Sequence, residues 1–246
     1  MGGYSSEYDI SLKSGQTVFE SLNRELYQPY RVIIRREGWV LLDDQRNEFP
    51  VNRHDFSATV DGTHLLFDCV FNAIHGSPGE DGLLQAYLDL LDIPYTSCGF
   101  YQAALTFNKR DLLSVLKPRG IYCAQSYQLD KGAEIHTDEI LERVGLPCFV
   151  KANRAGSSFG VTMVKRAENL QAAIDVAFKE DDEILIETAL KGTEVSVGVL
   201  RYRDEVRVLP ITEIIPEGDF FDYRAKYEGK SRELTPCLLY TSDAAD

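Results

Sequence analysis

Apolar runs rich in β-forming residues alternate with helical patterns along the first part of the chain. Residues 31–34, 39–42 and 69–74 have the apolar, β-branched character that predicts strands. Leucines recur at helical spacing over residues 84–91, which predicts a helix. This alternation indicates an α/β domain.

A second region continues the alternation. We expect a helix to open near Thr106, and we predict strands at 126–129, 148–151, 183–187 and 194–202 and a helix at 167–178. The boundary between the two regions is placed near residues 103–106. The alternating pattern ends at residues 216–236, a polar stretch with too many aromatic residues for a plain linker. Long loops with aromatic residues are typical of functional lids.

Both ends of the chain depart from this pattern. Gly2 and Gly3 lead into a helix start with Ser5 or Ser6 as its cap, a turn that normally follows a strand, so we expect a first strand to be missing. Residues 237–246 resemble the conceptual translation of a transposase sequencing adapter, and we expect them to be an artefact; a frayed C-terminus is the alternative.

Charge and composition narrow the function. A formal net charge of −13 and a pI near 4.8 argue against a nucleic acid or a membrane surface as partner, because both need clustered positive potential. The five cysteines are dispersed, and the first residues lack the features of a signal peptide. A cytoplasmic protein that binds a small substrate is therefore expected.

The segment from His75 to Ala86 is the strongest local signal. It follows an apolar run and enters a helix, which is where ligand sites form in α/β folds. Its three glycines allow close backbone approach, and the following helix N-terminus offers N–H groups to a carboxylate or phosphate. As an isolated feature, His75 is also compatible with an ordinary polar residue, and Glu80 and Asp81 with simple helix-cap acids.

Two further segments carry candidate chemistry. Lys151 ends a strand and precedes a glycine- and serine-rich loop, an arrangement that suits a flap over phosphates but equally a solvated hairpin. Glu187 ends another apolar strand and Glu194 follows it, so both could hold an adenine amino group and ribose hydroxyls. A Walker loop is not indicated, because Arg224 stands where that motif needs glycine before Gly229-Lys230-Ser231.

Taken together, these segments resemble the D-alanine–D-alanine ligase branch of the ATP-grasp superfamily. Four motifs carry the resemblance in the family order: Gly2-Gly3-Tyr4-Ser5-Ser6-Glu7, His75-Gly76-Ser77-Pro78-Gly79-Glu80-Asp81-Gly82, Lys151 with Gly156-Ser157-Ser158-Phe159-Gly160, and Asp222-Tyr223-Arg224-Ala225-Lys226-Tyr227. Such enzymes use ATP and Mg²⁺ or Mn²⁺ to join two D-alanines through a D-alanyl phosphate, for peptidoglycan synthesis. The implied partners are D-alanine and ATP, and a homodimer is the assembly to test.

The resemblance implies roles for the substrate-facing residues. Glu7 would accept the ammonium of the first D-alanine by a charge-assisted hydrogen bond. Ser157 and Tyr227 would join Glu7 in an orienting triad, and a tyrosine at position 227 favours an amine as the second nucleophile. His75 would stabilise charge beside the acylphosphate rather than act as a general base.

The resemblance also implies a nucleotide site and a domain plan. Lys151 and Lys226 would contact phosphates, Glu187 and Glu194 would read adenine and ribose, and Leu190 would lie near the hinge. The fold class is α/β (α+β), with an N-terminal doubly wound parallel-sheet domain at 1–104 that lacks its first strand. An incomplete ATP-grasp domain follows, with its small subdomain at 105–190 and the start of its large subdomain, including the lid at 220–236, at 191–236.

This sequence departs from the family at several positions. Leu113 replaces a family lysine that contacts phosphate, and Lys109 could compensate weakly. Ala155 and Arg224 stand where the family often has glutamates, from which we expect tuning rather than loss. The family's metal ligands lie beyond Pro236, so the site residues include no metal ligand and this polypeptide, as written, is expected to be inactive.

Two other readings remain open at this stage. Another ATP-grasp carboxylate–amine ligase would share the lysines and the adenine carboxylates, but would lack the His75 motif and the Ala225-Lys226-Tyr227 segment. A non-catalytic nucleotide-binding fragment is the alternative from a different class.

Overall fold

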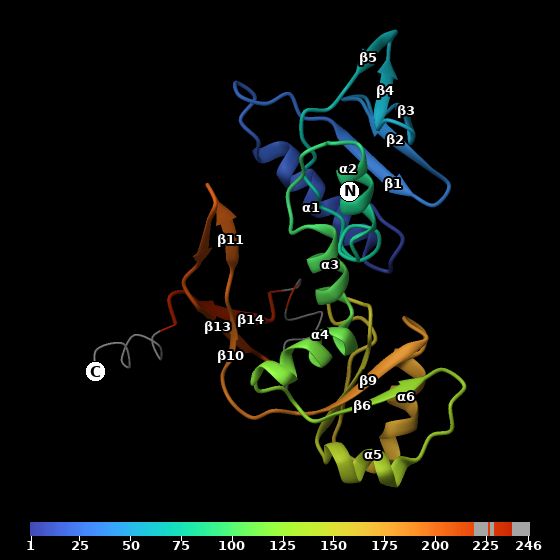
Figure 1. Ribbon diagram of the computed structural model, residues 1–246, viewed down its shortest axis with the longest axis vertical. Helices are drawn as coiled ribbons and strands as arrows, with labels where there is room; N and C mark the ends of the chain where they lie inside the picture. Colours follow the sequence, from blue (N-terminus) through green and yellow to red (C-terminus); the bar gives the residue numbers. More distant parts are fainter. Residues whose placement is uncertain (219–225, 227–228, 238–246) are drawn as a thin grey trace.

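The structure is a computed structural model that describes residues 1–218, 226 and 229–237. Its N-terminal region is built on an antiparallel sheet in which each strand pairs with the next along the chain. The strands are β1 (Arg31–Arg35), β2 (Gly38–Leu42), β3 (Glu48–Asn52), β4 (Ser57–Val60) and β5 (Thr63–Leu65). Helices α1 (Tyr8–Ser21), α2 (Leu83–Leu90) and α3 (Phe100–Phe107) complete the region, which lies at the top of Figure 1.

One apolar cluster joins this sheet to α2. Ile34 and Leu41 from the sheet and Leu84 and Leu88 from the helix are buried in it, together with Ile74 from the segment between them. Burial of side chains of this size stabilises the fold by about 1.5–3 kcal/mol each relative to exposure. The cluster therefore fixes both ends of the loop that runs from His75 to the start of α2.

The predictions for this region are confirmed in part. The class is α/β (α+β), and the strands expected at 31–34 and 39–42 and the helix at 84–91 are β1, β2 and α2. The strands of this sheet are joined by short turns, which permit only antiparallel pairing. Within the described residues of the region, parallel pairing is limited to two isolated bridges, Gly2 with Ile34 and Val70 with Tyr95.

The strand predicted at 69–74 is wrong. Only Val70 makes a bridge there, because the next residues direct their hydrogen bonds into a loop. The Asn72 N–H donates to Oγ1 of Thr96 at 3.0 Å, and its side-chain Nδ2 donates to the Gly79 carbonyl at 2.7 Å. A polar residue inside an apolar run thus supports the loop rather than extending a ladder.

The second region holds a sheet with the strand order β6–β9–β7–β8, all antiparallel. Its strands are β6 (Ser126–Asp130), β7 (Cys148–Ala152), β8 (Thr162–Val164) and β9 (Glu183–Thr188). Helices α5 (Thr137–Val144) and α6 (Leu170–Ala177), the latter preceded by the 3₁₀ turn η2 (Ala167–Asn169), lie against this sheet at the bottom of Figure 1. The strands and the helix predicted here from sequence are confirmed.

The two faces of this sheet have different chemistry. Val150, Ile184 and Ile186 are fully buried in a core with α5 and α6. Because neighbouring residues of a strand point to opposite faces, Lys151 and Glu187 belong to the face away from those helices. The face with Lys151 and Glu187, called the polar face below, thus carries charged groups, while the apolar face holds the subdomain together.

Helix α4 (Lys109–Leu116) and the 3₁₀ turn η1 (Lys117–Arg119) connect the two regions, immediately after α3. Asn108 caps α4, because its side-chain oxygen accepts from the Asp111 N–H at 3.1 Å. The helix predicted to open near Thr106 therefore corresponds to α4, preceded by the separate helix α3.

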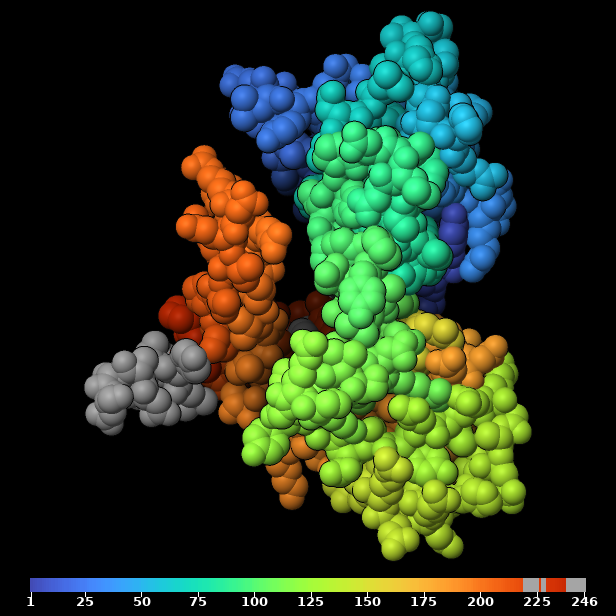
Figure 2. Space-filling view, in the orientation of Figure 1, coloured from blue at the N-terminus to red at the C-terminus, as the bar shows by residue number. Residues whose placement is uncertain are grey.

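The last described strands are β10 (Glu194–Ser196), β11 (Val199–Tyr202), β12 (Glu205–Val208), β13 (Thr212–Pro216) and β14 (Ser231–Leu234). They form a three-stranded sheet ordered β10–β13–β14 and a β11–β12 hairpin. Figure 2 shows a hollow between this orange part and the N-terminal region. Cys237 is buried, and its N–H donates to the Ile211 carbonyl at 2.8 Å. None of the helices among the described residues has the length and apolar character needed to span a bilayer.

Candidate active site

Glu7 lies at the start of α1 and is 2% exposed. Two glycines make room for its carboxylate: a Cβ on Gly156 would lie 2.9 and 3.0 Å from its two oxygens, and one on Gly76 would lie 3.1 Å from Oε2. The Glu7 N–H donates to Ser5 Oγ at 3.2 Å, whereas Glu7 itself is the N-cap residue and makes no side-chain capping bond. The carboxylate is therefore enclosed by loops from both regions of the chain.

His75 is held from α1. Its Nε2 lies 3.0 Å from Ser14 Oγ, and its carbonyl accepts from Ser5 Oγ at 2.9 Å. Ser14 follows Glu7 by seven residues, which is two helical turns, so both project from the same side of the helix. The first helix thus positions both predicted substrate-facing residues.

The loop after His75 is closed by its own side chains. Glu80 Oε2 accepts from the Gly76 N–H at 2.8 Å, and Asp81 Oδ1 accepts from the Leu83 N–H at 3.1 Å. The Leu84 N–H donates to the Pro78 carbonyl at 2.9 Å. The first N–H groups of α2, expected to face an anion, are therefore used within the loop.

The pKa of the Glu80 carboxyl group depends on the charges around the His75 loop. Partial desolvation raises the pKa of its carboxyl, and the negative charge of Glu7 raises it further. The Gly76 N–H and the positive fields of His75 and Lys109 act in the opposite direction. Charged residues from the start of α1, the His75 loop and the start of α4 thus lie close enough to shift the pKa of Glu80.

The glycine-rich loop after β7 is anchored to α4. Lys109 Nζ donates to the carbonyls of Asn153 at 3.1 Å and Ala155 at 2.7 Å. Asn153 is fully buried, and its amide accepts from the Arg110 N–H at 2.9 Å and donates to Glu183 Oε2 at 2.8 Å. The Lys109 ammonium therefore contacts the base of the loop, and its contact with a phosphate stays a prediction.

Burial, together with the nearby positive charge of Lys151, lowers the pKa of Lys109 to about 8. Glu187 and Glu7 are among the carboxylates that oppose this effect. The ion pair between Lys151 and Glu187 lies on the polar face of the sheet, with Lys151 on β7 and Glu187 on β9. Two predicted nucleotide residues are thus paired with each other close to Lys109.

Four other residues predicted for the site lie in the Gly156 loop, beside it, or beyond β9. Ser157, next to Gly156, has a positive φ of 49°, as does Ser158 at 61°, so the loop turns sharply there. Lys226 Nζ donates to Ser158 Oγ at 2.8 Å. Leu190 is exposed and Glu194 lies on the exposed strand β10. Tyr227 and residues 220–225 and 228 of the expected lid lie outside the described residues.

Sequence reasoning missed three groups that organise the site. Ser14 was detectable from its helical spacing to Glu7, whereas Asn153 and the Glu80 contact to Gly76 depend on tertiary structure. Among the residues that the structure describes, no cluster of three or more His, Cys, Asp or Glu side chains could hold a metal ion. The described side chains therefore do not form the metal site that the resemblance implies.

Comparison with known proteins identifies the family. A model of the D-ala D-ala ligase N-terminus matches residues 1–98, and one of the D-ala D-ala ligase C-terminus matches residues 116–243. A D-alanine–D-alanine ligase from Flavobacterium johnsoniae is 62% identical over 239 residues, which are 97% of this chain and 74% of that protein. One from Christiangramia forsetii is 58% identical over 243 residues, 99% of this chain and 74% of that protein.

Solved structures agree with this result. D-alanyl-alanine synthetase A from Vibrio cholerae has a TM-score of 0.78 at 31% identity, covering 95% of this chain and 71% of that one. The VanG D-Ala:D-Ser ligase from Enterococcus faecalis has a TM-score of 0.76 at 32% identity, covering 97% and 75%. The fold and the clustered site thus define the class as that of D-amino-acid ligases with the ATP-grasp fold. Within that class, the chain belongs to the D-alanine–D-alanine ligase family.

Proposed function

We propose that this protein joins two D-alanines, with ATP as the energy source, to supply peptidoglycan synthesis. The ATP γ-phosphoryl group is transferred to the carboxylate of the first D-alanine, giving a D-alanyl phosphate and ADP. The amine of the second D-alanine then attacks the acyl carbon, and phosphate leaves as the peptide bond forms. The buried Glu7 carboxylate, enclosed by Gly76 and Gly156, is the observation that carries this proposal.

Glu7 serves in this proposal as the acceptor for the first D-alanine's ammonium. A buried carboxylate needs a cationic or hydrogen-bonding partner, and an α-ammonium supplies both. His75 lies across the same corner and stabilises the negative charge that develops on the acylphosphate. Ser157 and Tyr227 complete the orienting triad with Glu7.

The nucleotide in this proposal lies on the polar face of the β6–β9–β7–β8 sheet. Lys151 releases Glu187 to meet the phosphates, while Glu187 receives the adenine amino group. Lys226 approaches the phosphates from beside Ser158, Glu194 takes the ribose hydroxyls, and Leu190 lies at the hinge. A Bacillus anthracis D-alanine–D-alanine ligase solved with ATP has the same fold, with a TM-score of 0.69 at 26% identity over 97% of this chain and 69% of that one.

The proposal extends to the setting of the reaction. Mg²⁺ or Mn²⁺ would neutralise the triphosphate, but the described residues do not assemble its ligands and no step here depends on them. We place the reaction in the cytoplasm, with D-alanine and ATP as partners and without nucleic acid or membrane. A homodimer is the proposed assembly, and sedimentation velocity tests it.

The test is phosphate release from ATP by the protein expressed from the complete reading frame. Release should depend on D-alanine and not on L-alanine, and equal rates with both would overturn the substrate assignment. Because one structural neighbour is a D-Ala:D-Ser ligase, the product should also be identified with D-serine and D-lactate supplied as second substrates. A preferred ester or D-alanyl-D-serine product would replace the proposed dipeptide.

A further inference from the structure

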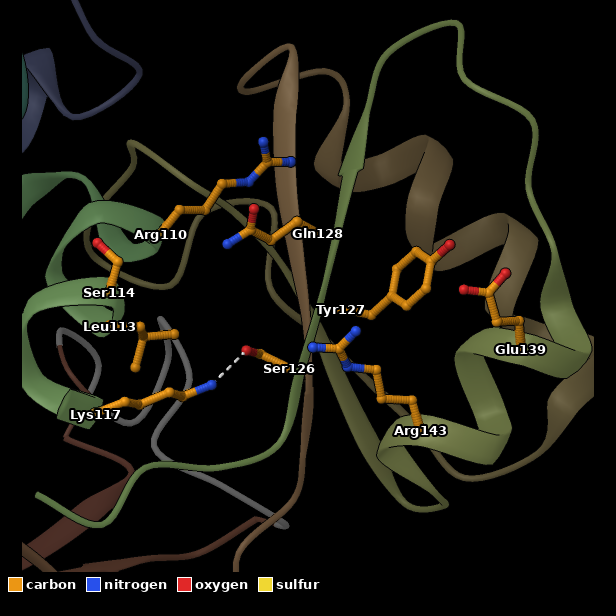
Figure 3. A pocket seen from close by; sticks show the side chains of 9 residues that line it. All are labelled: Arg110, Leu113, Ser114, Lys117, Ser126, Tyr127, Gln128, Glu139 and Arg143. Atoms are coloured by element: carbon orange, nitrogen blue, oxygen red, sulfur yellow. Dashed lines mark hydrogen bonds between the residues drawn. The ribbon is translucent and has the colours of Figure 1, made fainter. Parts of the chain in front are cut away.

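A cavity of about 440 Å³ lies between α4 and β6, away from Glu7. Figure 3 shows that Lys117, Leu113 and Ser126 line one part of it, and that Arg143 reaches in from α5. This volume falls in the range of small-molecule sites. The cavity has no role in the reaction as described so far.

Lys117 brings a positive charge into this cavity. Its Nζ donates to Ser126 Oγ at 3.0 Å, the contact drawn in Figure 3. Among the described residues, no carboxylate lies within ion-pair distance of Lys117, whereas Lys151 is paired with Glu187 and Lys131 with Asp182. The Lys117 ammonium is therefore a cation of this cavity that a ligand can neutralise without first displacing a carboxylate.

Ser126 connects this cation to the nucleotide face. In the β6–β9 ladder Ser126 lies directly opposite Glu187, and residues directly opposite in an antiparallel pair project from the same face about 5 Å apart. Glu187 in turn contacts Lys151. Lys117, Ser126, Glu187 and Lys151 therefore follow one another across the same surface.

The neighbouring lysine of α4, Lys109, has different partners. Lys109 is committed to the carbonyls of Asn153 and Ala155, and Leu113 offers only an apolar wall. Lys117 follows Leu113 by four residues, one helical turn, and so extends from the same side of the connecting segment. Its flexible four-carbon stem allows the ammonium to move from a hydroxyl to a phosphate oxygen.

We propose that Lys117 is a nucleotide-binding residue, whose ammonium leaves Ser126 and contacts a phosphate of ATP bound beside Glu187 and Lys151. This inference rests on the proposed function, because it assumes that the polar face of the sheet receives ATP. In the bound state Leu113 packs beside the nucleotide. Arg110 continues to tie α4 to the sheet through the Leu129 and Ile184 carbonyls.

The test compares ATP and adenosine binding by calorimetry for the wild type, Lys117→Met and Lys117→Arg. A charge-assisted hydrogen bond contributes about 1.5–3 kcal/mol, so Lys117→Met should weaken ATP binding by about 10- to 150-fold. Adenosine binding should stay within about twofold, and Lys117→Arg should recover most of the ATP affinity. Equal losses for ATP and adenosine, or no loss for ATP, would overturn the inference.

Two further variants test whether Lys117 binds ATP directly or only supports the local structure. Ser126→Ala removes the resting partner of Lys117, so it should leave ATP affinity unchanged or slightly higher; a loss equal to that of Lys117→Met would assign Lys117 a structural role. Lys179→Met removes an exposed charge two residues after the end of α6 and should not affect ATP binding. If the wild type binds no ATP, the proposed function fails. If the wild type binds ATP and Lys117→Met binds it with the same affinity, only this inference is refuted.

Discussion

Gly156→Ala should selectively disturb the Glu7 carboxylate. The new methyl carbon would lie 2.9 and 3.0 Å from the two carboxylate oxygens, about half an ångström closer than ordinary contact. The carboxylate has little freedom to retreat, because Glu7 is 2% exposed and Gly76 lies against Oε2 from the other side. The substitution therefore displaces the group that is proposed to receive the first D-alanine.

The magnitude follows from the cost of overpacking. One extra methyl group in a closely packed site costs about 1–3 kcal/mol, which corresponds to about 5- to 150-fold in a dissociation constant when the strain falls on the binding geometry. Calorimetric titration with D-alanine measures this change directly. Urea unfolding of the same variant shows whether the strain also falls on the fold.

Gly38→Ala is the matched control, because a Cβ at Gly38 meets no atom within 4 Å. It should bind D-alanine like the wild type. The reasoning would be refuted if Gly156→Ala retained wild-type D-alanine affinity while folding normally. Equal losses in both variants would show that the effect is not specific to Glu7.

Three other predictions concern Lys109, Ser14 and Ile174. Burial disfavours the charged form of Lys109 and lowers its pKa from 10.5 to about 8, so its cost to the fold is complete below pH 8 and disappears toward pH 10.5. From pH 7 to 9.5 the unfolding free energy of the wild type should gain about 2 kcal/mol relative to Lys109→Met, and parallel urea-derived profiles for the two proteins would contradict this. Ser14→Ala removes the partner of His75 Nε2, so the tautomer ratio of His75 should change in ¹⁵N NMR spectra, and an unchanged ratio would show that Ser14 does not position it. Ile174→Ala empties a fully buried site between α6 and the sheet and should cost about 2–5 kcal/mol in urea unfolding, so a cost below 1 kcal/mol would mean that the site collapses.

Much of the second region could be predicted from sequence because its strands have a simple pattern. β7 and β9 are apolar runs that end near Lys151 and Glu187, so both their extent and their chemistry are visible locally. The predicted strand at 194–202 is divided into β10 and β11, since the Gly198 carbonyl accepts from the Leu209 N–H. That division depends on a partner eleven residues away in the sequence, which the hydrophobic pattern does not reveal.

The candidate site was likewise only partly predictable from the sequence. Glu7, His75 and Lys151 lie in compact motifs, and their residue types alone suggested their chemistry. The contact of Lys109 with the Asn153 carbonyl could not be predicted, because Asn153 is 44 residues away and the contact exists only once α4 packs on the loop. Contacts between distant segments of this kind need the fold itself.

The enclosure of Glu7 by Gly76 and Gly156 means that selection of the first amino acid is a property of neither half of the molecule alone. The two glycines come from segments matched by different family models, residues 1–98 and 116–243. Separately expressed halves should therefore bind D-alanine only after reassociation. Exchange of one half between relatives by recombination would preserve the pocket only where both glycines are retained.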